Sequence, residues 1–170
     1  SVGKALSSDA RIDGVCFTGS TVTAQSINRA MAANVAPHAP LIAETGGLNA
    51  MIVDSTALPE QAVRDIVASA FQSAGQRCSA LRVLYVQQDV ADKMLTMLYG
   101  AMDELRVGAP WNLATDVGPA IDAAAKAKID AHIKKAQHEG RLLHQVSVPS
   151  EGHFVAPSVI RVNGISDLRE

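Results

Sequence analysis

Short apolar runs alternate along the chain with longer stretches whose apolar residues recur at helical spacing. Brief β-branched or aromatic runs bounded by Gly, Pro, Ser or Thr are typical of strands, and the longer periodic stretches are typical of helices. The pattern predicts strands at residues 14–17, 41–44, 50–53, 81–86, 142–143, 154–155 and 159–162. It predicts helices at residues 22–34, 59–73, 89–105 and 120–139.

Local signals mark where these helices begin and end. Pro59 suits the first turn of a helix and Asp89 is expected to cap the next one, whereas Gly75 and Gly140 suit helix ends. Strands separated by helices of this length favour βαβ crossovers and a mainly parallel sheet. The sequence therefore predicts an α/β fold.

Composition and charge narrow the classes of function. The chain is 48% hydrophobic and 19% charged, as in ordinary folded domains. Its net charge of −2 gives no basis for binding of nucleic acid or an anionic membrane by this segment. No stretch reaches the roughly 20 apolar residues of a membrane span. Two cysteines without a Cys-x-x-Cys pair, and histidines without ligand spacing, argue against a disulfide framework and a metal site, so we expect a cytoplasmic location.

The first segment with chemical potential is the turn Phe17–Thr21, between a predicted strand and a predicted helix. A helix N-terminus exposes backbone N–H groups and a partial positive charge, which suit a phosphate. Gly19 permits close backbone approach, and Ser20 adds a hydroxyl donor. The alternative is that Ser20 or Thr21 merely caps the helix.

The second segment begins with Glu44, at the carboxyl end of an apolar strand and followed by Thr45, Gly46 and Gly47. Ligands of open α/β folds gather at the carboxyl ends of strands. A partly desolvated carboxylate there would have a raised pKa and suit a general base. The alternative is a strand-end carboxylate that pairs with a nearby Arg.

The third segment surrounds Cys78, which follows Gly75-Gln76-Arg77 and precedes a predicted strand. Thiolates are the reactive form of cysteine and are favoured by nearby cations and N–H donors. A lone cysteine is more often a small buried residue, and this is what we expect of Cys16, inside its strand. The polar, glycine-containing approach to Cys78 favours a nucleophile instead.

In this order and spacing, the three segments resemble the aldehyde dehydrogenase superfamily. The motifs are Phe-Thr-Gly-Ser at 17–20, Glu-x-Gly-Gly-x-Asn at 44–49 and Gly-Gln-x-Cys at 75–78. The residues around the last two are similar to the branch that oxidises L-glutamate γ-semialdehyde (1-pyrroline-5-carboxylate), a module of bifunctional enzymes of proline catabolism. The resemblance runs through essentially the whole chain, including Thr115–Pro119.

The resemblance implies NAD-dependent oxidation of an aldehyde through a thiohemiacetal and a thioester. It assigns Cys78 as the nucleophile and Glu44 as the base that activates water. It implies that Gly19, Ser20 and Gly46 contact the cofactor. Ser79 is implied to hold the carboxylate of the substrate, and the alternative is that its hydroxyl only bonds the adjacent backbone.

The resemblance also implies the organisation of a larger enzyme with a three-layer fold. Residues 1–43 would complete its dinucleotide-binding domain, and residues 44–170 would form part of its catalytic domain. The parent is implied to be a homo-oligomer in the cytoplasm or at the inner face of the membrane. If it is bifunctional, it carries FAD in a separate proline dehydrogenase domain.

Several family segments are not found among these residues, namely those that hold the two riboses of the cofactor, the oxyanion Asn and the dimerising strand. We therefore expect the chain to be a piece that binds NAD weakly, does not turn over aldehyde alone and self-associates through uncovered sheet edges. Two alternatives stay open: a dehydrogenase of another semialdehyde, and a domain that keeps only the fold. The presence of both Cys78 and Glu44 argues against the second.

One motif does not transfer. Pro110-Trp111-Asn112 looks like the family's oxyanion motif but follows Cys78, whereas the family's motif precedes the phosphate turn. Asn112 is expected to satisfy loop backbone. Arg77 and Arg82 are left unassigned, since either could attract an anionic substrate or serve the structure.

Overall fold

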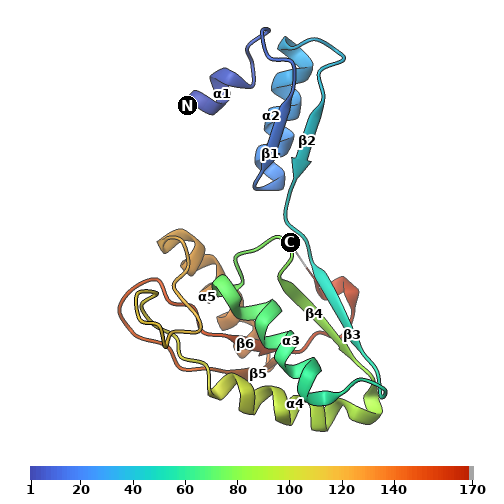
Figure 1. The fold of residues 1–170 in the computed structure, drawn as a ribbon, viewed down its shortest axis with the longest axis vertical. Coiled ribbons are helices and arrows are strands. Elements are labelled where there is room, and N and C mark those ends of the chain that lie inside the picture. The colour runs from blue at the N-terminus through green and yellow to red at the C-terminus, as the bar shows by residue number, and fades with distance from the viewer. Residues whose placement is uncertain (169–170) are drawn as a thin grey trace. The chain divides into compact units, whose positions relative to one another are not determined.

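A computed structural model describes residues 1–168 and divides the chain into two compact units (Figure 1). The first is Ser1–Gly47, and the second begins at Leu48. Each unit contains a parallel pair of strands joined through a helix. This is the βαβ arrangement that the sequence pattern predicts.

The first unit places one helix between two parallel strands. Its elements are α1 (Val2–Leu6), β1 (Val15–Thr18), α2 (Thr21–Asn34) and β2 (Leu41–Glu44). Ala24 and Met31 of α2 are buried, as is Val35 directly after it. The extended backbone of Val35 ends α2 ahead of Pro37, in agreement with the predicted helix end.

Cys16 is not the buried residue that the sequence led us to expect. Its side chain is exposed, as is that of Thr18 two positions along β1. Successive strand residues point to opposite faces, and the register pairs Cys16 with Ile42 and Thr18 with Glu44. These four exposed residues share one open face of the β1–β2 pair, whereas Val15 and Phe17 on the other face are partly covered.

The second unit is built around a second parallel pair. It begins with β3 (Asn49–Val53), α3 (Pro59–Phe71), η1 (Gln72–Gly75), β4 (Leu81–Val86) and α4 (Gln88–Asp103). It continues with α5 (Ala123–His138), β5 (Leu142–Gln145), β6 (Ser158–Ile160) and η2 (Ile165–Asp167). The β5–β6 pair is antiparallel, so the described residues form three two-stranded sheets rather than one.

The core of the second unit lies where α3 and α4 pack against the β3–β4 pair. Its buried members are Val53, Val63, Ile66, Leu81, Met94, Leu98, Met102 and Val146. Met94, Leu98 and Met102 follow the i, i+4, i+8 spacing that places them on one side of α4. Aliphatic side chains and methionine fill this core.

We expect Leu98→Ala to lower the free energy of unfolding of the second unit by about 2–5 kcal/mol, because it leaves a cavity among packed side chains. Leu98 is 2% exposed. Leu113→Ala makes the same chemical change at a residue that is 104% exposed, and its expected effect is within about 0.5 kcal/mol. Urea denaturation followed by circular dichroism measures both. Equal effects at the two positions would contradict this description of the core.

Two local predictions were wrong. Asp89 does not cap α4, because Gln87 is the N-cap and Asp89 lies in the first turn, where its charge favours the helix N-terminus. Residues 154–155 form no strand. The carbonyl of Phe154 accepts a hydrogen bond from Lys126 Nζ at 2.7 Å instead of joining a ladder.

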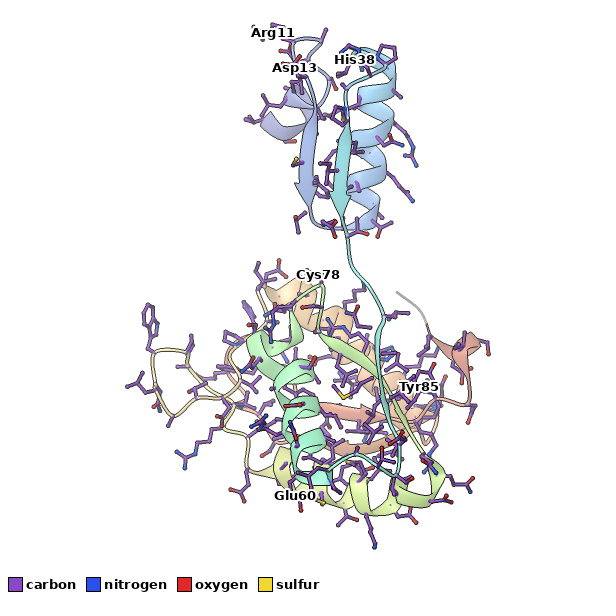
Figure 2. All side chains as sticks on the ribbon, turned by 45° about the vertical axis from the view of Figure 1, so that its right-hand side comes forward. Arg11, Asp13, His38, Glu60, Cys78 and Tyr85 are labelled. Carbon is purple, nitrogen blue, oxygen red and sulfur yellow. The ribbon has the colours of Figure 1, made fainter. Side chains whose placement is uncertain are left out.

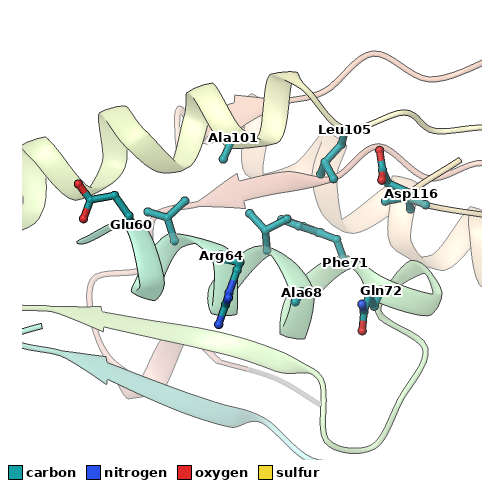
Figure 3. Close-up of a pocket in the computed structure, with 11 residues that line it drawn as sticks. Glu60, Arg64, Ala68, Phe71, Gln72, Ala101, Leu105 and Asp116 are labelled. Carbon is teal, nitrogen blue, oxygen red and sulfur yellow. The ribbon is translucent and has the colours of Figure 1, made fainter. Parts of the chain in front are cut away.

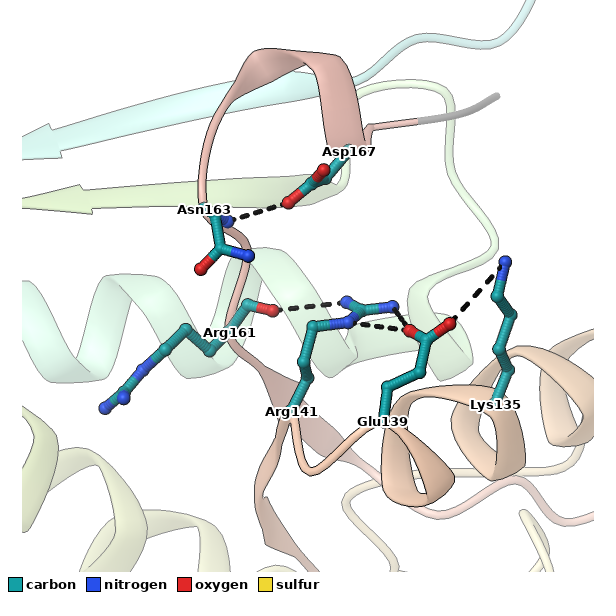
Figure 4. A network of polar contacts seen from close by, with 6 residues as sticks. All are labelled: Lys135, Glu139, Arg141, Arg161, Asn163 and Asp167. Carbon is teal, nitrogen blue, oxygen red and sulfur yellow. Dashed lines mark hydrogen bonds and ion pairs between the residues drawn. The ribbon is translucent and has the colours of Figure 1, made fainter.

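A polar network ties the end of α5 to Arg161, the residue directly after β6 (Figure 4). Arg141 donates to Glu139 through Nε at 2.8 Å and to the carbonyl of Arg161 at 3.2 Å. The guanidinium of Arg141 lowers the pKa of Glu139. Lys135 adds a looser contact, 3.9 Å from Glu139. The network closes the turn at Gly140, whose φ of 69° suits the helix end that its sequence predicted.

Candidate active site

The backbone makes an unusual turn just before Cys78. α3 ends at Phe71, two residues before its predicted end, and Ser73, Ala74 and Gly75 then adopt φ values of 55°, 53° and 67°. This left-handed conformation costs a non-glycine residue roughly 1–2 kcal/mol. Gly75 is required here, because a Cβ would lie 2.8 Å from the carbonyl oxygen of Ala70. Strain of this kind gathers at functional sites, where surrounding contacts hold it.

Cys78 follows in a turn that we call the cysteine turn, Gln76–Ala80. Its thiol is free and its side chain exposed (Figure 2). The N–H of Ala80 donates to the carbonyl of Arg77 at 3.1 Å and closes the turn. β4 begins directly afterwards at Leu81. A solvent-accessible thiol on an ordered turn is the arrangement that a nucleophile needs.

Gln76 ties the cysteine turn to a distant part of the second unit. Its Nε2 donates to the carbonyl of Pro119 at 3.2 Å, and its Oε1 accepts from the N–H of Ile121 at 2.7 Å. These contacts join the turn to the segment that leads into α5. The sequence singled out Gln76 only as part of the Gly-Gln-x-Cys motif and did not predict these contacts. The polar side chain between Gly75 and Cys78 was the one sign that a hydrogen bond to another segment would form here.

The two arginines left unassigned both contact neutral groups. Arg77 Nη2 donates to Gln72 Oε1 at 3.0 Å, and Arg82 Nη2 donates to the carbonyl of Gly75 at 2.5 Å. The Arg82 contact holds the backbone that leads into the cysteine turn, which is a structural role, whereas Arg77 lines a hollow beside Ser79. Asn49 also reaches the turn, through hydrogen bonds to the carbonyls of Cys78 at 2.6 Å and Ala80 at 2.9 Å.

Ser79 lines a hollow of about 350 Å³ beside the turn. Arg77 and Asp65 bring opposite charges to its wall, and Ser69 adds a second hydroxyl. Ser79 is exposed. A hydroxyl and a guanidinium at one hollow can together hold a carboxylate.

A second hollow, of about 440 Å³, is lined by α3, α4 and the segment after α4 (Figure 3), and it shares Ala68 and Gln72 with the first. Its wall includes Val63, Phe71, Leu105 and Val117 and is largely apolar. Neither Cys78 nor Ser79 belongs to it. None of the residues singled out in the sequence for chemistry therefore lines this hollow.

Glu44 and the Phe17–Thr21 turn lie together in the first unit. Thr18 is the register partner of Glu44, and the N–H of Gly19 donates to the carbonyl of Glu44 at 3.1 Å. The side chain of Glu44 is exposed, so the partial desolvation that we expected is not found. The alternative partner, an Arg, is not found either among the ion pairs of residues 1–168.

The N-terminus of α2 fits an anion. Ser20 caps the helix, its Oγ accepting from the N–H of Thr23 at 3.2 Å, which is the simpler of its two expected roles. The first turn contains no acidic residue, and Gly19 and Ser20 are exposed. Gly19 also lacks room for a side chain, because a Cβ would meet the ring of Phe17 at 2.5 Å. A helix N-terminus of this kind carries a partial positive charge that favours a phosphate.

The first unit holds Glu44, Gly19, Ser20 and Gly46, and the second holds Cys78 and Ser79. Gly46 lies in the exposed loop after β2. Among residues 1–168, no three or more His, Cys, Asp or Glu side chains gather as they would around a metal ion. Within the same range, no helix has the length and apolar character of a membrane span.

Comparison with known proteins identifies the class. The model of the Aldehyde dehydrogenase family matches residues 1–166, and the chain therefore belongs to that family. The bifunctional protein PutA of Klebsiella aerogenes is 53% identical over 180 aligned residues, covering 99% of this chain and 14% of that protein. A 1-pyrroline-5-carboxylate dehydrogenase of Geobacillus thermodenitrificans is 41% identical over 70% of this chain. The chain thus spans about one seventh of the PutA protein that it matches.

Solved structures give the same result. A mutant of Bradyrhizobium japonicum proline utilization A (PutA) superposes with a TM-score of 0.95 and 54% identity, over 99% of this chain and 17% of that one. A further aldehyde dehydrogenase from Burkholderia cenocepacia, described as putative, has a TM-score of 0.85 at 30% identity. These matches confirm the predicted α/β class and the resemblance to an aldehyde dehydrogenase.

Proposed function

We propose that these residues work within a longer NAD-dependent enzyme that oxidises L-glutamate γ-semialdehyde to L-glutamate in proline catabolism. The observation that carries this proposal is the exposed thiol of Cys78 on an ordered turn after strained backbone. The similarity to PutA proteins and to a 1-pyrroline-5-carboxylate dehydrogenase supports the choice of substrate.

Cys78 performs the first half of the proposed reaction. Its thiolate adds to the aldehyde carbon, forming a C–S bond and an oxyanion. The backbone N–H of Cys78 is a proposed donor to that oxyanion. When the C=O bond re-forms, the carbon loses a hydride and remains bound to sulfur as a thioester. Sulfur suits this role because it is a strong nucleophile and also a good acyl leaving group.

Glu44 performs the second half in this proposal. Its carboxylate takes a proton from water, the resulting hydroxide adds to the thioester carbon, and the C–S bond breaks to release glutamate and the thiolate. Gly19 and Ser20 at the N-terminus of α2, together with Gly46, would hold NAD, which when bound would accept the hydride. The open face that carries Glu44 beside Thr18 keeps that carboxylate accessible to water.

Ser79 is proposed to recognise the carboxylate of the substrate. Its hydroxyl lines the same hollow as Arg77. Within the described residues the guanidinium of Arg77 is not paired with a carboxylate, since it donates its hydrogen bond to the neutral Gln72. A charge-assisted hydrogen bond contributes about 1.5–3 kcal/mol, so Ser79 is expected to affect binding more than chemistry.

The wider organisation of the enzyme is likewise proposed. Residues 1–43 would belong to the dinucleotide-binding domain and residues 44–170 to the catalytic domain of a cytoplasmic homo-oligomer. A proline dehydrogenase domain elsewhere in the parent would carry FAD. The 170-residue chain alone is proposed to reduce no NAD, because it represents 14% of the length of its PutA relative.

A hybrid enzyme tests the proposal. It is Klebsiella aerogenes PutA with the stretch that matches this chain replaced by these 170 residues. We expect the hybrid to reduce NAD with glutamate semialdehyde, and Ser79→Ala to raise its KM for that substrate by about tenfold, with a smaller change in kcat. Pentanal, which has no carboxylate, is the control substrate, and its KM should stay unchanged. Equal changes for both aldehydes would remove Ser79 from carboxylate recognition, and an inactive but folded hybrid would contradict the proposed function.

A second candidate substrate comes from another relative. An N-succinylglutamate 5-semialdehyde dehydrogenase of Novosphingobium aromaticivorans is 36% identical over 97% of this chain. The hybrid enzyme separates the two possibilities when it is supplied with each semialdehyde in turn. A higher kcat/KM with the succinylated substrate would favour this second candidate.

A further inference from the structure

The pairing of β3 with β4 contains an irregularity next to the cysteine turn. Asn49 pairs with Leu81, but Ala50 pairs with Val83, so Arg82 is an extra residue in β4. An extra residue of this kind redirects side chains and is frequent beside active sites. Here it allows Asn49 of one strand and Arg82 of the other to reach the same turn.

The two side chains hold opposite ends of that segment. Arg82 holds the carbonyl of Gly75, before the cysteine. Asn49 Nδ2 donates to the carbonyls of Cys78 and Ala80, on either side of Ser79. The side-chain amide has two N–H donors, one for each carbonyl. A single side chain therefore holds the peptide group between Cys78 and Ser79 and the one between Ala80 and Leu81.

Fixing these carbonyls also fixes the groups attached to them. In a planar trans peptide the C=O and the following N–H point in opposite directions. With the carbonyl of Cys78 directed at Asn49, the N–H of Ser79 must point away from it. Similarly, the N–H that follows the carbonyl of Ala80 is that of Leu81, and it donates to Ser69 Oγ at 3.2 Å.

We propose that Asn49 is a positioning residue, which directs the thiol of Cys78 and the hydroxyl of Ser79 by holding the carbonyls on both sides of Ser79. This inference rests on the proposed role of Cys78. It gives a task to the Asn of the Glu-x-Gly-Gly-x-Asn motif, which the proposed reaction does not use. The carbonyl oxygen of Cys78, once released, can turn toward the sulfur, and its partial negative charge then disfavours the thiolate.

The experiment measures the alkylation of Cys78 by iodoacetamide in the 170-residue chain, between about pH 6 and 10. Peptide mass spectrometry separates Cys78 from Cys16, which serves as an internal reference. At pH 7 we expect Asn49→Ala to slow Cys78 about threefold and Asn49→Asp about tenfold, since the latter adds a negative charge. The alkylation rates of Cys78 in the unmodified chain and in the two variants should converge at high pH. The variants leave Arg77, Arg82 and Asp65, the charged groups beside the turn, unchanged.

A purely structural role predicts the opposite result. Loosening the turn would expose Cys78 further and speed its alkylation at every pH, without moving the pH of half-maximal rate. Asn112→Ala is the matched control, because Asn112 Oδ1 accepts from the N–H of Ala114 at 3.0 Å in a loop away from the turn. It should leave the Cys78 profile unchanged.

The outcomes separate this inference from the proposed function. If Cys78 in the unmodified chain reacts no faster than Cys16, the proposed nucleophile is wrong. If Cys78 reacts faster but the Asn49 variants match the unmodified chain or exceed it, only the positioning role is overturned. If both Asn49 variants unfold, Cys16 and Cys78 will be alkylated at equal rates. That result also counts against the positioning role, because the side-chain amide of Asn49 would then be needed for folding.

Discussion

Cys78→Ser in the hybrid enzyme is expected to lower NAD reduction with glutamate semialdehyde by on the order of 10⁴-fold. A serine hydroxyl is almost wholly protonated at neutral pH and forms an ester rather than a thioester, so both halves of the proposed reaction suffer. The exposed turn accepts serine without steric change. Steady-state absorbance of reduced NAD measures the loss.

Cys16→Ser is the matched control, because Cys16 is also a free and exposed thiol but lies on β1 of the first unit. Its expected effect on kcat is less than about twofold. A comparable loss of activity in both variants would mean that the effect of Cys78→Ser is not specific to a nucleophile. Retained activity in Cys78→Ser would remove the nucleophile on which the proposed function depends.

The fold was predictable where local signals and packing agree. The strands 41–44 and 81–86 were predicted at the bounds that β2 and β4 have, because runs of apolar residues there end at polar or glycine-containing turns. The helix 120–139 begins later, at Ala123, because Asp122 is extended and caps it by accepting from the N–H of Ala125. Before the cap, the N–H groups of Ala120 and Ile121 bond His153 and Gln76. Such partners are far apart in the chain, and no local pattern reveals them.

The exposure of Cys16 shows a different limit of sequence reasoning. An apolar run at a strand indicates burial only when both faces of the sheet are covered. In the first unit one face of β1 is open, and a run such as Val15–Phe17 does not state how many layers will pack on it. The same limit explains why one mainly parallel sheet was expected where the described residues form three pairs.

For the candidate site, the sequence identified the residues that carry chemistry but missed those that hold them. Cys78 was singled out by its setting and its motif, and the structure adds that the preceding Ser73 and Ala74 are left-handed. Neither residue type favours that conformation, so composition gave no sign of it. Asn49 reaches the cysteine turn from 29 positions away along the chain, and Gln76 links the turn to Pro119 and Ile121. Their roles became visible only through the β3–β4 irregularity and the contacts with Pro119 and Ile121.

Glu44→Gln should separate the two halves of the proposed reaction. Glutamine keeps the shape of the side chain but cannot take a proton from water, so the thioester should form and then persist. We expect the hybrid enzyme carrying this variant to reduce about one NAD per Cys78 in a rapid burst, followed by turnover slowed by roughly 10²–10⁴-fold. Rapid-mixing absorbance measures the burst, and mass spectrometry of the quenched protein measures the acyl group on Cys78.

Glu60→Gln is the control for the loss of a carboxylate, because Glu60 is exposed and lies on α3, in the wall of the apolar hollow. It should leave both the burst and the steady rate within about twofold. The role of Glu44 is decided by which half of the reaction the Glu44→Gln variant slows. A slow steady rate with a full burst makes it the base of hydrolysis, whereas loss of the burst itself would place its action before the thioester and would require a different base for the water.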